Sequence, residues 1–303
     1  MSIDTVEELR ATGWDDLVDR LYAESWRESL ARFRSRYAFR GMSRTEYRLT
    51  TSLGRLGRDT TQALEEPILR AFRKYAQGGT QLPGSSIWNW LALAQHHGLS
   101  TRLLDWTYSP LVAMHFATEN ERNLHADGVI WCVDYPHTNE LLPEKLKQIL
   151  QDEGSDVFTA DMLEQAAGSL SAFDALAGEP FVAFFEPPSL DDRIVNQYAL
   201  FSLVSDPSID LGDWLREHPD MARCIVIPAE LKLEIRDKLD QSNITERVLY
   251  PGLDGLCKWL NRYYAPRQVF EEVMRAERQT DSGPDGAGGE EEGLPGEGEL
   301  APA

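Results

Sequence analysis

The segment QHHGLSTRLLDWTYSPLVAMHFA, residues 95–117, places polar side chains between two apolar patterns of helical period. The first pattern, SSIWNWLALAQHHG, has Ser86 in the N-cap position and Gly98 where a helix needs a left-handed terminal residue. The second, SPLVAMHFA, begins with Ser109 as N-cap and Pro110 as the first helical residue. The intervening TRLLDW is typical of a short strand. The sequence therefore predicts a helix, a strand and a second helix, with the polar residues at the corner.

Other short runs predict the rest of the sheet. GVIWCVD, FVAFFEP, YALFSLVS and RCIVIP are β-rich and bounded by Pro, Asp or Gly, and YAFRG predicts a strand that stops at Gly41. Helical patterns occupy residues 61–76 and most of 141–177 and 229–278. Because this order is not a regular βαβ alternation, it indicates an α+β fold with a central mixed or antiparallel split sheet and surrounding helices.

Composition divides the chain into three parts. Residues 1–36 read as an amphipathic N-terminal helical segment that caps the fold, and residues 37–278 as one α+β domain. Residues 279–303 are rich in Gly, Pro and Glu, and this composition predicts a disordered acidic tail.

Charge and apolar content limit the classes of partner. The formal net charge of −20 argues against binding to a nucleic-acid backbone, which needs a footprint of lysine and arginine. No apolar run approaches the roughly 20 residues that span a bilayer, and MSIDTVEELR lacks the features of a secretory signal. We therefore expect a cytoplasmic protein with no membrane partner. Cys132 and Cys224 lie in apolar runs and are expected to be buried thiols.

Common catalytic signatures are absent from the sequence: there is no GxSxG elbow, no GxxxxGK[ST] phosphate loop and no HExxH. A metal site drawn from His96, His97, Asp105 and His115 is disfavoured, because adjacent histidines on a helix point about 100° apart. No metal is expected. A backbone carbonyl near the helix end is the plain partner for His97.

Arg102 and Asp105 stand at an odd offset, so on a strand they face opposite sides. Asp105 lies between Leu104 and Trp106, and we expect it to be buried, where a carboxylate needs a cation or several N–H donors. Arg40 and Arg193 are the candidate cations. The alternative is a buried ion network that only fixes one arrangement of the loops.

Four motifs together resemble the FRG domain family: FRG at 39–41, QHHGLSTRLLDWT at 95–107, RIVNQYALF at 193–201 and LYPGLDGL at 249–256. The resemblance spans about residues 37–262 and implies a bacterial or phage origin. Two positions depart from the family pattern, Ser100 where proline is common and Ala199 where glycine is common.

FRG and DWTYSPLVAMHFA are also similar to two elements of ADP-ribosyltransferases. This weaker resemblance implies that NAD is a substrate and that Arg40 grips its pyrophosphate or ribose. A carboxylate on a late strand would then anchor the 2′-hydroxyl and stabilise the oxocarbenium-like ribose. Glu186 could do both, whereas Gln197 could only hold a hydroxyl.

The sequence thus gives two hypotheses for function. The first is an NAD-binding, ADP-ribosyltransferase-like or NAD-consuming effector with a nucleotide or other anionic small molecule as ligand, and with a protein as a second class of target. The second is a non-catalytic ligand- or protein-binding module in which the arginine–aspartate cluster is structural. The candidate catalytic residues are Gln197 and Glu186, and the candidate ligand-binding residues are Arg40, Gln95, His97, Thr101, Arg102, Asp105, Thr107, Ser109 and Arg193.

Overall fold

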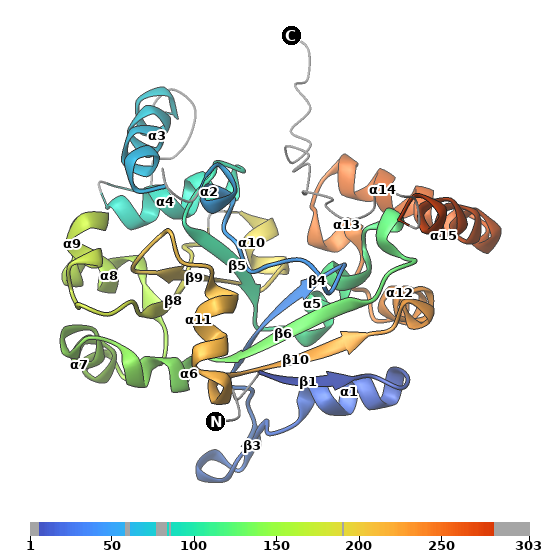
Figure 1. Ribbon diagram of the computed structural model, residues 1–303, viewed down its shortest axis with the longest axis horizontal. Coiled ribbons are helices and arrows are strands. Elements are labelled where there is room, and N and C mark those ends of the chain that lie inside the picture. Colours follow the sequence, from blue (N-terminus) through green and yellow to red (C-terminus); the bar gives the residue numbers. More distant parts are fainter. Residues whose placement is uncertain (1–5, 58–60, 77–83, 85, 190, 282–303) are drawn as a thin grey trace.

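A mixed sheet of eight strands forms the centre of the computed structural model, which describes residues 6–57, 61–76, 84, 86–189 and 191–281 (Figure 1). The spatial order of the strands is β1-β10-β6-β4-β5-β9-β8-β7. Their bounds are β1 (Glu7–Arg10), β4 (Tyr37–Met42), β5 (Leu103–Thr107), β6 (Gly128–Asp134), β7 (Phe158–Thr159), β8 (Val182–Glu186), β9 (Ala199–Val204) and β10 (Ala222–Ile227). A separate hairpin consists of β2 (Trp26–Arg27) and β3 (Arg32–Phe33).

The sheet splits between β4 and β5. β4 pairs with β6 over six residue pairs, and β5 pairs with β9 over five. Between β4 and β5, however, the register holds a single pair, Phe39 with Thr107. We call the diverging stretch beyond this pair, residues 40–42 of β4 and 103–106 of β5, the β4–β5 split. The α+β fold with a split, mixed sheet is therefore confirmed.

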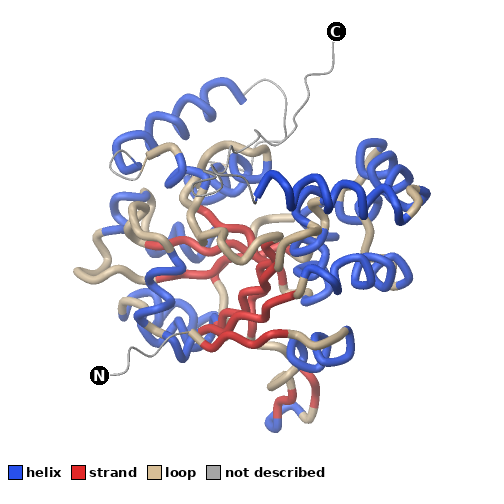
Figure 2. The backbone as a smooth tube through the Cα atoms, turned by 45° about the vertical axis from the view of Figure 1, so that its right-hand side comes forward, coloured by secondary structure: helices blue, strands red, loops and turns tan. Residues whose placement is uncertain are grey.

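Helices cover both faces of the sheet (Figure 2). Their bounds are α1 (Trp14–Tyr22), α2 (Ser52–Arg55), α3 (Thr61–Tyr75), α4 (Ile87–His96), α5 (Pro110–Thr118), α6 (Tyr135–Thr138), α7 (Glu144–Glu153), α8 (Ala160–Ala166), α9 (Leu170–Asp174), α10 (Asp192–Asn196), α11 (Leu211–Glu217), α12 (Lys232–Gln241), α13 (Glu246–Leu249), α14 (Leu253–Tyr264) and α15 (Arg267–Asp281).

Two groups of helices share one face of the sheet. Helices α1, α5 and α12 pack on the part that contains Phe39 of β4, and α4, α7, α8 and α9 pack on the part that contains Phe201 of β9. Helix α11 covers the opposite face, over Trp106 and Leu200. The β4–β5 split lies where the two groups meet.

The predicted helix, strand and helix around residue 100 are confirmed. The Ser86 hydroxyl accepts a hydrogen bond from Trp88 N and caps α4, and Gly98 follows the helix with φ of 78°. The Ser109 hydroxyl accepts from Val112 N and caps α5, which starts at Pro110. Local rules of capping therefore position both helices that flank β5.

The two ends of the chain differ from the expectation. Residues 7–10 form an edge strand, β1, which pairs in parallel with β10, so the N-terminal part is not a purely helical cap. The sequence EELR shows no alternation of apolar and polar residues. Backbone pairing with β10 holds this strand at the edge of the sheet, so it needs no apolar face. Helix α15 continues to Asp281, three residues into the predicted tail, and residues 282–303 lie outside the described part.

Within the described residues, no helix has both the length and the apolar character needed to cross a membrane. Cys132 and Cys224 are buried, as expected, and burial raises the pKa of the Cys132 thiol to about 12. Neither thiol is therefore ionised near neutral pH.

Candidate functional site

The four motif segments, which are distant in sequence, are joined by direct contacts. Phe39 of the first pairs with Thr107 of the second, and Thr107 pairs with Ala199 of the third. The Thr107 hydroxyl donates to the carbonyl of Gln197 at 2.7 Å, and the Gln197 amide donates to the carbonyl of Leu249 in the fourth segment at 3.0 Å. These contacts bring strand ends from three places in the chain to the β4–β5 split.

Arg40 spans the split. Its Nη1 donates to the backbone carbonyl of Asp105 at 2.6 Å, across the stretch where β4 and β5 have no further register pair. The arginine side chain therefore takes over part of the role of a missing backbone ladder, and it is half-buried. Arg40 thus lies beside Asp105, but the bond is to the backbone carbonyl and not to the carboxylate for which Arg40 was a candidate cation.

Gly41 lies directly against helix α5. A Cβ at this position would lie 1.8 Å from the carbonyl oxygen of Ala113 and 2.7 Å from the nitrogen of Ala117. Both atoms belong to the backbone of α5. The glycine of the FRG motif therefore allows α5 to pack closely against β4.

Asp105 is exposed, so the prediction that it is buried was wrong. Its neighbours Leu104 and Trp106 point to the α11 face, whereas Asp105 points to the seam between the two helix groups. Its carboxylate accepts from Gln95 Nε2 at 2.8 Å, and Gln95 Oε1 accepts from the hydroxyl of Thr101 at 2.5 Å. A polar chain from α4 thus holds the carboxylate in place, instead of the arginine that we expected.

Arg102 does not face a ligand. It is 2% exposed, its Nε and Nη2 donate to the carboxylate of Glu65, and its Nη1 and Nη2 donate to that of Asp174. Arg102 precedes β5 and turns toward α3 and α9, away from the split. The assignment of Arg102 to ligand binding is therefore replaced by a buried ion triad, the alternative reading of this cluster.

Several other predicted residues contact one another or neighbouring parts of the fold. The Thr107 hydroxyl is buried and also accepts from Ser109 N at 3.0 Å, while Ser109 caps α5. The guanidinium of Arg193 lies over the ring of Tyr250 at 5.3 Å from its centroid. The Gln197 amide nitrogen clamps α10 to the end of α13, so this residue holds the segments together.

The two histidines at the end of α4 have separate environments. His96 Nε2 lies 2.6 Å from the carboxylate of Asp191, which also caps α10 by accepting from Ile194 N. His97 lies at the surface, but the partial desolvation of its imidazole and the charge of the nearby His96 lower its pKa. Among the described residues, no group of three or more His, Cys, Asp or Glu side chains could hold a metal ion.

Glu186 stands at the end of β8, where its exposed carboxylate accepts from the hydroxyl of Tyr108 at 2.9 Å. Continuing the β8–β9 register by one residue puts Glu186 in a row with Leu200 and Trp106 on the α11 face. Arg40 shares this face, because Ala38 and Met42, two residues to either side of it in β4, pack there. Glu186 and Asp105 therefore occupy opposite faces of the sheet.

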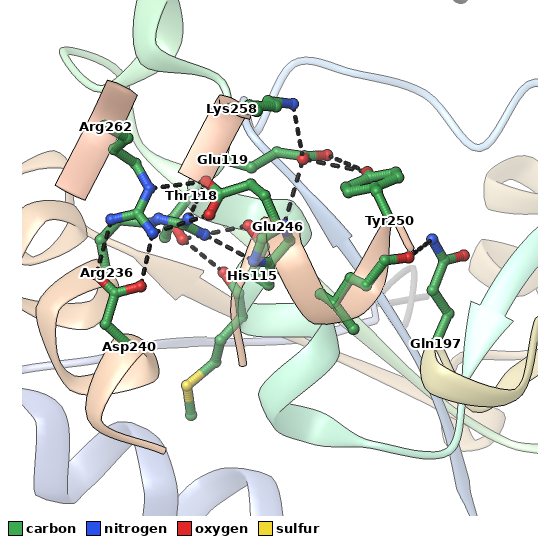
Figure 3. A network of polar contacts seen from close by, with 12 residues as sticks. His115, Thr118, Glu119, Gln197, Arg236, Asp240, Glu246, Tyr250, Lys258 and Arg262 are labelled. Carbon is green, nitrogen blue, oxygen red and sulfur yellow. Dashed lines mark hydrogen bonds and ion pairs between the residues drawn. The ribbon is translucent and has the colours of Figure 1, made fainter. Parts of the chain in front are cut away.

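Sequence reasoning missed a buried ion network between α12, α13 and α14 (Figure 3). Glu246, of which 1% of the side chain is exposed, accepts from Arg236 Nη2 at 2.5 Å and from Arg262 Nε at 2.7 Å. Arg262 also donates two hydrogen bonds to Asp240. Burial acts to raise the pKa of Glu246, but the hydrogen bonds and charge of Arg262, with the charge of Arg236, outweigh it and hold the pKa at about 2.

The network continues to the motif segments. Arg236 Nη1 lies 2.8 Å from Nδ1 of His115, a fully buried residue of α5, and His115 Nε2 lies 3.3 Å from Glu119. The Tyr250 hydroxyl donates to Glu119 at 3.2 Å. Burial lowers the pKa of His115, so the imidazole is neutral at pH 7. The only hint in the sequence is the proximity of Glu246 to the LYPGLDGL motif.

Comparison with known proteins agrees with the motif reading. Residues 35–126 match the family model of the FRG domain. This stretch contains β4, β5 and the helices α2 to α5, and it includes the first two motif segments. No curated protein matches the chain significantly, and no solved structure does so either. Over residues 35–126 the chain therefore matches the FRG domain family.

Proposed function

We propose that the β4–β5 split binds an anionic nucleotide, with NAD as the first candidate. The observation that carries this proposal is the placement of Arg40, whose guanidinium reaches across the split to the Asp105 carbonyl on the face of the sheet that also carries the exposed carboxylate of Glu186. A guanidinium suits a pyrophosphate, which it can bind through two parallel hydrogen bonds. A carboxylate suits the hydroxyl groups of a ribose, since it is an acceptor only. An ADP-ribose unit carries both groups.

Cleavage of the nicotinamide glycosidic bond is the further step of this proposal. In it the C1′–N bond breaks, nicotinamide leaves with the bonding electron pair, and water or a protein nucleophile attacks C1′ and gives up a proton. A carboxylate near C1′ stabilises the positive charge that develops on the ribose. Glu186 and Asp105, which are exposed on the two faces of the sheet, are our two candidates for this role.

A non-catalytic module is the second candidate, and one observation favours it. The side chains of Thr107, Ser109 and Gln197 form hydrogen bonds with backbone groups of one another or of neighbouring segments. Arg102 is likewise enclosed by two carboxylates. Much of the polarity in the motifs therefore holds the fold together, as a binding scaffold would require.

Calorimetry with NAD, ADP-ribose and ATP tests the first candidate. We expect the wild type to bind at least one of them, and Arg40→Ala to weaken binding about ten- to a hundredfold, the loss of one charge-assisted contact. Arg216→Ala, which removes an exposed arginine paired with Asp213, is the matched control and should bind as the wild type does. Absence of wild-type binding to all three nucleotides would overturn the proposal.

Release of nicotinamide from NAD, followed by chromatography, tests the catalytic step. Asp105→Asn and Glu186→Gln each keep the shape of the side chain and remove its charge, so the variant that loses turnover while still binding NAD identifies the carboxylate. No release by the wild type, despite NAD binding, would leave the chain a binding module.

A further inference from the structure

A second concave site lies on the other side of the ion network, enclosed by α12, α14 and α15. The pocket has a volume of about 400 Å³, within the range of small-molecule sites. Arg236, Asp240 and Arg262 from the network belong to its lining, and Trp259, Tyr263 and Phe270 supply aromatic surface. None of its lining residues belongs to the β4–β5 split, so the pocket is separate from the nucleotide site proposed above.

Three residues that line this pocket have a buried hydrogen-bond donor without an acceptor. The Nε of Arg236, the hydroxyl of Thr245 and the Nε1 of Trp259 are buried and have no hydrogen-bond partner in the described structure. All three residues line the pocket. Thr245 is 2% exposed and Arg236 is 3% exposed. A buried donor without an acceptor costs about 1–3 kcal/mol, so three at one pocket favour a ligand that brings acceptor atoms.

One arginine of the lining also favours an anion. Arg236 and Arg262 are paired with Glu246 and Asp240, and Arg267 is paired with Glu271. Arg247, in contrast, is hydrogen-bonded to the neutral Asn243, and among the described residues it has no carboxylate partner. The lining arginines are Arg236, Arg247, Arg262 and Arg267, and the acidic residues are Glu121, Asp237 and Asp240.

The aromatic residues define the shape of the ligand. The ring centroids of Trp259 and Tyr263 are 5.1 Å apart, and the guanidinium of Arg247 lies over the Trp259 ring at 4.6 Å from its centroid. Arg247 is exposed and hydrogen-bonded to Asn243, so its planar group covers the indole at the mouth of the pocket. A flat ring can take this stacking position when Arg247 moves aside.

We propose that this pocket binds a small aromatic carboxylate. Its ring stacks on Trp259 and Tyr263, and its carboxylate accepts from Arg247 and from the buried donors of Trp259, Thr245 and Arg236 after the rim side chains adjust. The binding does not depend on the nucleotide site, because the two sites share no lining residue.

Calorimetry with indole-3-acetate tests the proposal, with neutral indole-3-acetamide as the matched ligand. We expect one-to-one binding of the acetate and at least tenfold weaker binding of the acetamide, which has the same ring but no charge. Trp259→Phe keeps a ring and removes the N–H donor, and Tyr263→Ala removes an exposed ring; each should weaken binding at least fivefold. Trp26→Phe, in the β2–β3 hairpin, is the control and should leave the affinity unchanged.

Three results would each overturn the proposal: no binding of indole-3-acetate by the wild type, equal affinity for acetate and acetamide, or unchanged affinity in both pocket variants. Circular dichroism confirms that each variant is folded. If Trp259→Phe does not fold, Tyr263→Ala decides, since its side chain is half exposed. Addition of NAD should leave indole-3-acetate binding intact, and competition between them would contradict two separate sites.

Discussion

Gly41 shows how one residue of the FRG motif serves packing. The backbone of α5 lies so close to β4 that a Cβ at position 41 would meet the Ala113 carbonyl at 1.8 Å. A backbone atom in the middle of a helix cannot step aside as the end of a flexible side chain can. The contact sets the distance between the strand that carries Arg40 and the helix that follows β5.

Gly41→Ala should therefore destabilise the protein strongly. Overpacking of a core costs about 1–3 kcal/mol, and a clash between backbones falls at the upper end or beyond. We expect a melting temperature several degrees lower, or no folded protein, by circular dichroism. Gly178→Ala is the control, because a Cβ there meets nothing within 4 Å. Equal stability of Gly41→Ala and the wild type would disprove the packing role.

Arg102→Met should destabilise the fold by about 3–5 kcal/mol, because it leaves the carboxylates of Glu65 and Asp174 without their cation. Urea unfolding measures the loss. Adding Glu65→Gln and Asp174→Asn to the same chain should restore part of the stability, since the uncompensated charges are then gone. If Arg102→Met is instead as stable as the wild type but no longer binds the nucleotide, Arg102 is a ligand contact.

Prediction at this scale succeeded where the cause is local. Ser86 and Ser109 were identified as caps because a cap depends on three or four adjacent residues. Arg102 was misassigned because its partners, Glu65 and Asp174, stand 37 and 72 residues away. Asp105 was misassigned because its exposure depends on a seam between two helix groups, which one strand cannot reveal.

At the scale of elements, α12, α13 and α14 are joined through one carboxylate. Glu246 stands between Arg236 and Arg262, and Asp240 completes the pairing of Arg262. These charged side chains are almost completely buried, so each arginine is stable in the folded protein only with its carboxylate partners in place. The network therefore makes the attachment of α14 sensitive to acid.

The free energy of unfolding should fall in acid through Glu246. Its folded-state pKa of about 2 is below the ordinary value of 4.5, so its contribution is fully present above pH 4.5 and is lost as the pH falls toward 2. The difference of about 2.5 units corresponds to about 3 kcal/mol. Urea unfolding between pH 3 and 6 should show a smaller acid loss in Glu246→Gln than in the wild type.

Glu234→Gln is the control for this pH series, because Glu234 is half exposed and pairs with Lys238 on the surface of α12. Its acid loss should match that of the wild type. An identical pH dependence in Glu246→Gln and the wild type would show that Glu246 does not link the helices electrostatically.

Most elements could be predicted from apolar period, and the exceptions share a cause. The runs that form β6, β8, β9 and β10 are apolar because those strands are buried. β1 was missed because EELR lies at the edge of the sheet and needs only backbone pairing with β10. The ion network was missed because its arginines and acids lie among apolar residues in patterns typical of a solvated helix face.

In the whole molecule, strands that are neighbours in the sheet come from distant parts of the sequence. The FRG match ends at residue 126, just before β6, although β6 is the strand on which β4 pairs over its full length. The other neighbour in the central sheet, β9, begins at residue 199 and completes β5. Eleven of the twelve register pairs of β4 and β5 are thus made with strands outside the matched stretch, six with β6 and five with β9.

A chain of residues 35–126 alone should therefore fail to fold. β4 and β5 share a single register pair, which cannot hold two strands together without β6 and β9. We expect no cooperative thermal transition for this fragment. Residues 6–281, which contain every described helix and strand, are the control and should melt cooperatively. A sharp transition in the fragment would show that the matched stretch is an independent unit.

The β4–β5 split has a mechanical consequence. Along the strands, the two halves of the sheet are linked by the Phe39–Thr107 pair and by the hydrogen bond from Arg40 to the Asp105 carbonyl. On the proposed function, an anion that drew the guanidinium to itself would remove the second link and leave the backbone pair as a pivot. Binding in the split and the angle between the two half-sheets would then be coupled, because Arg40 would leave the Asp105 carbonyl as it bound the ligand.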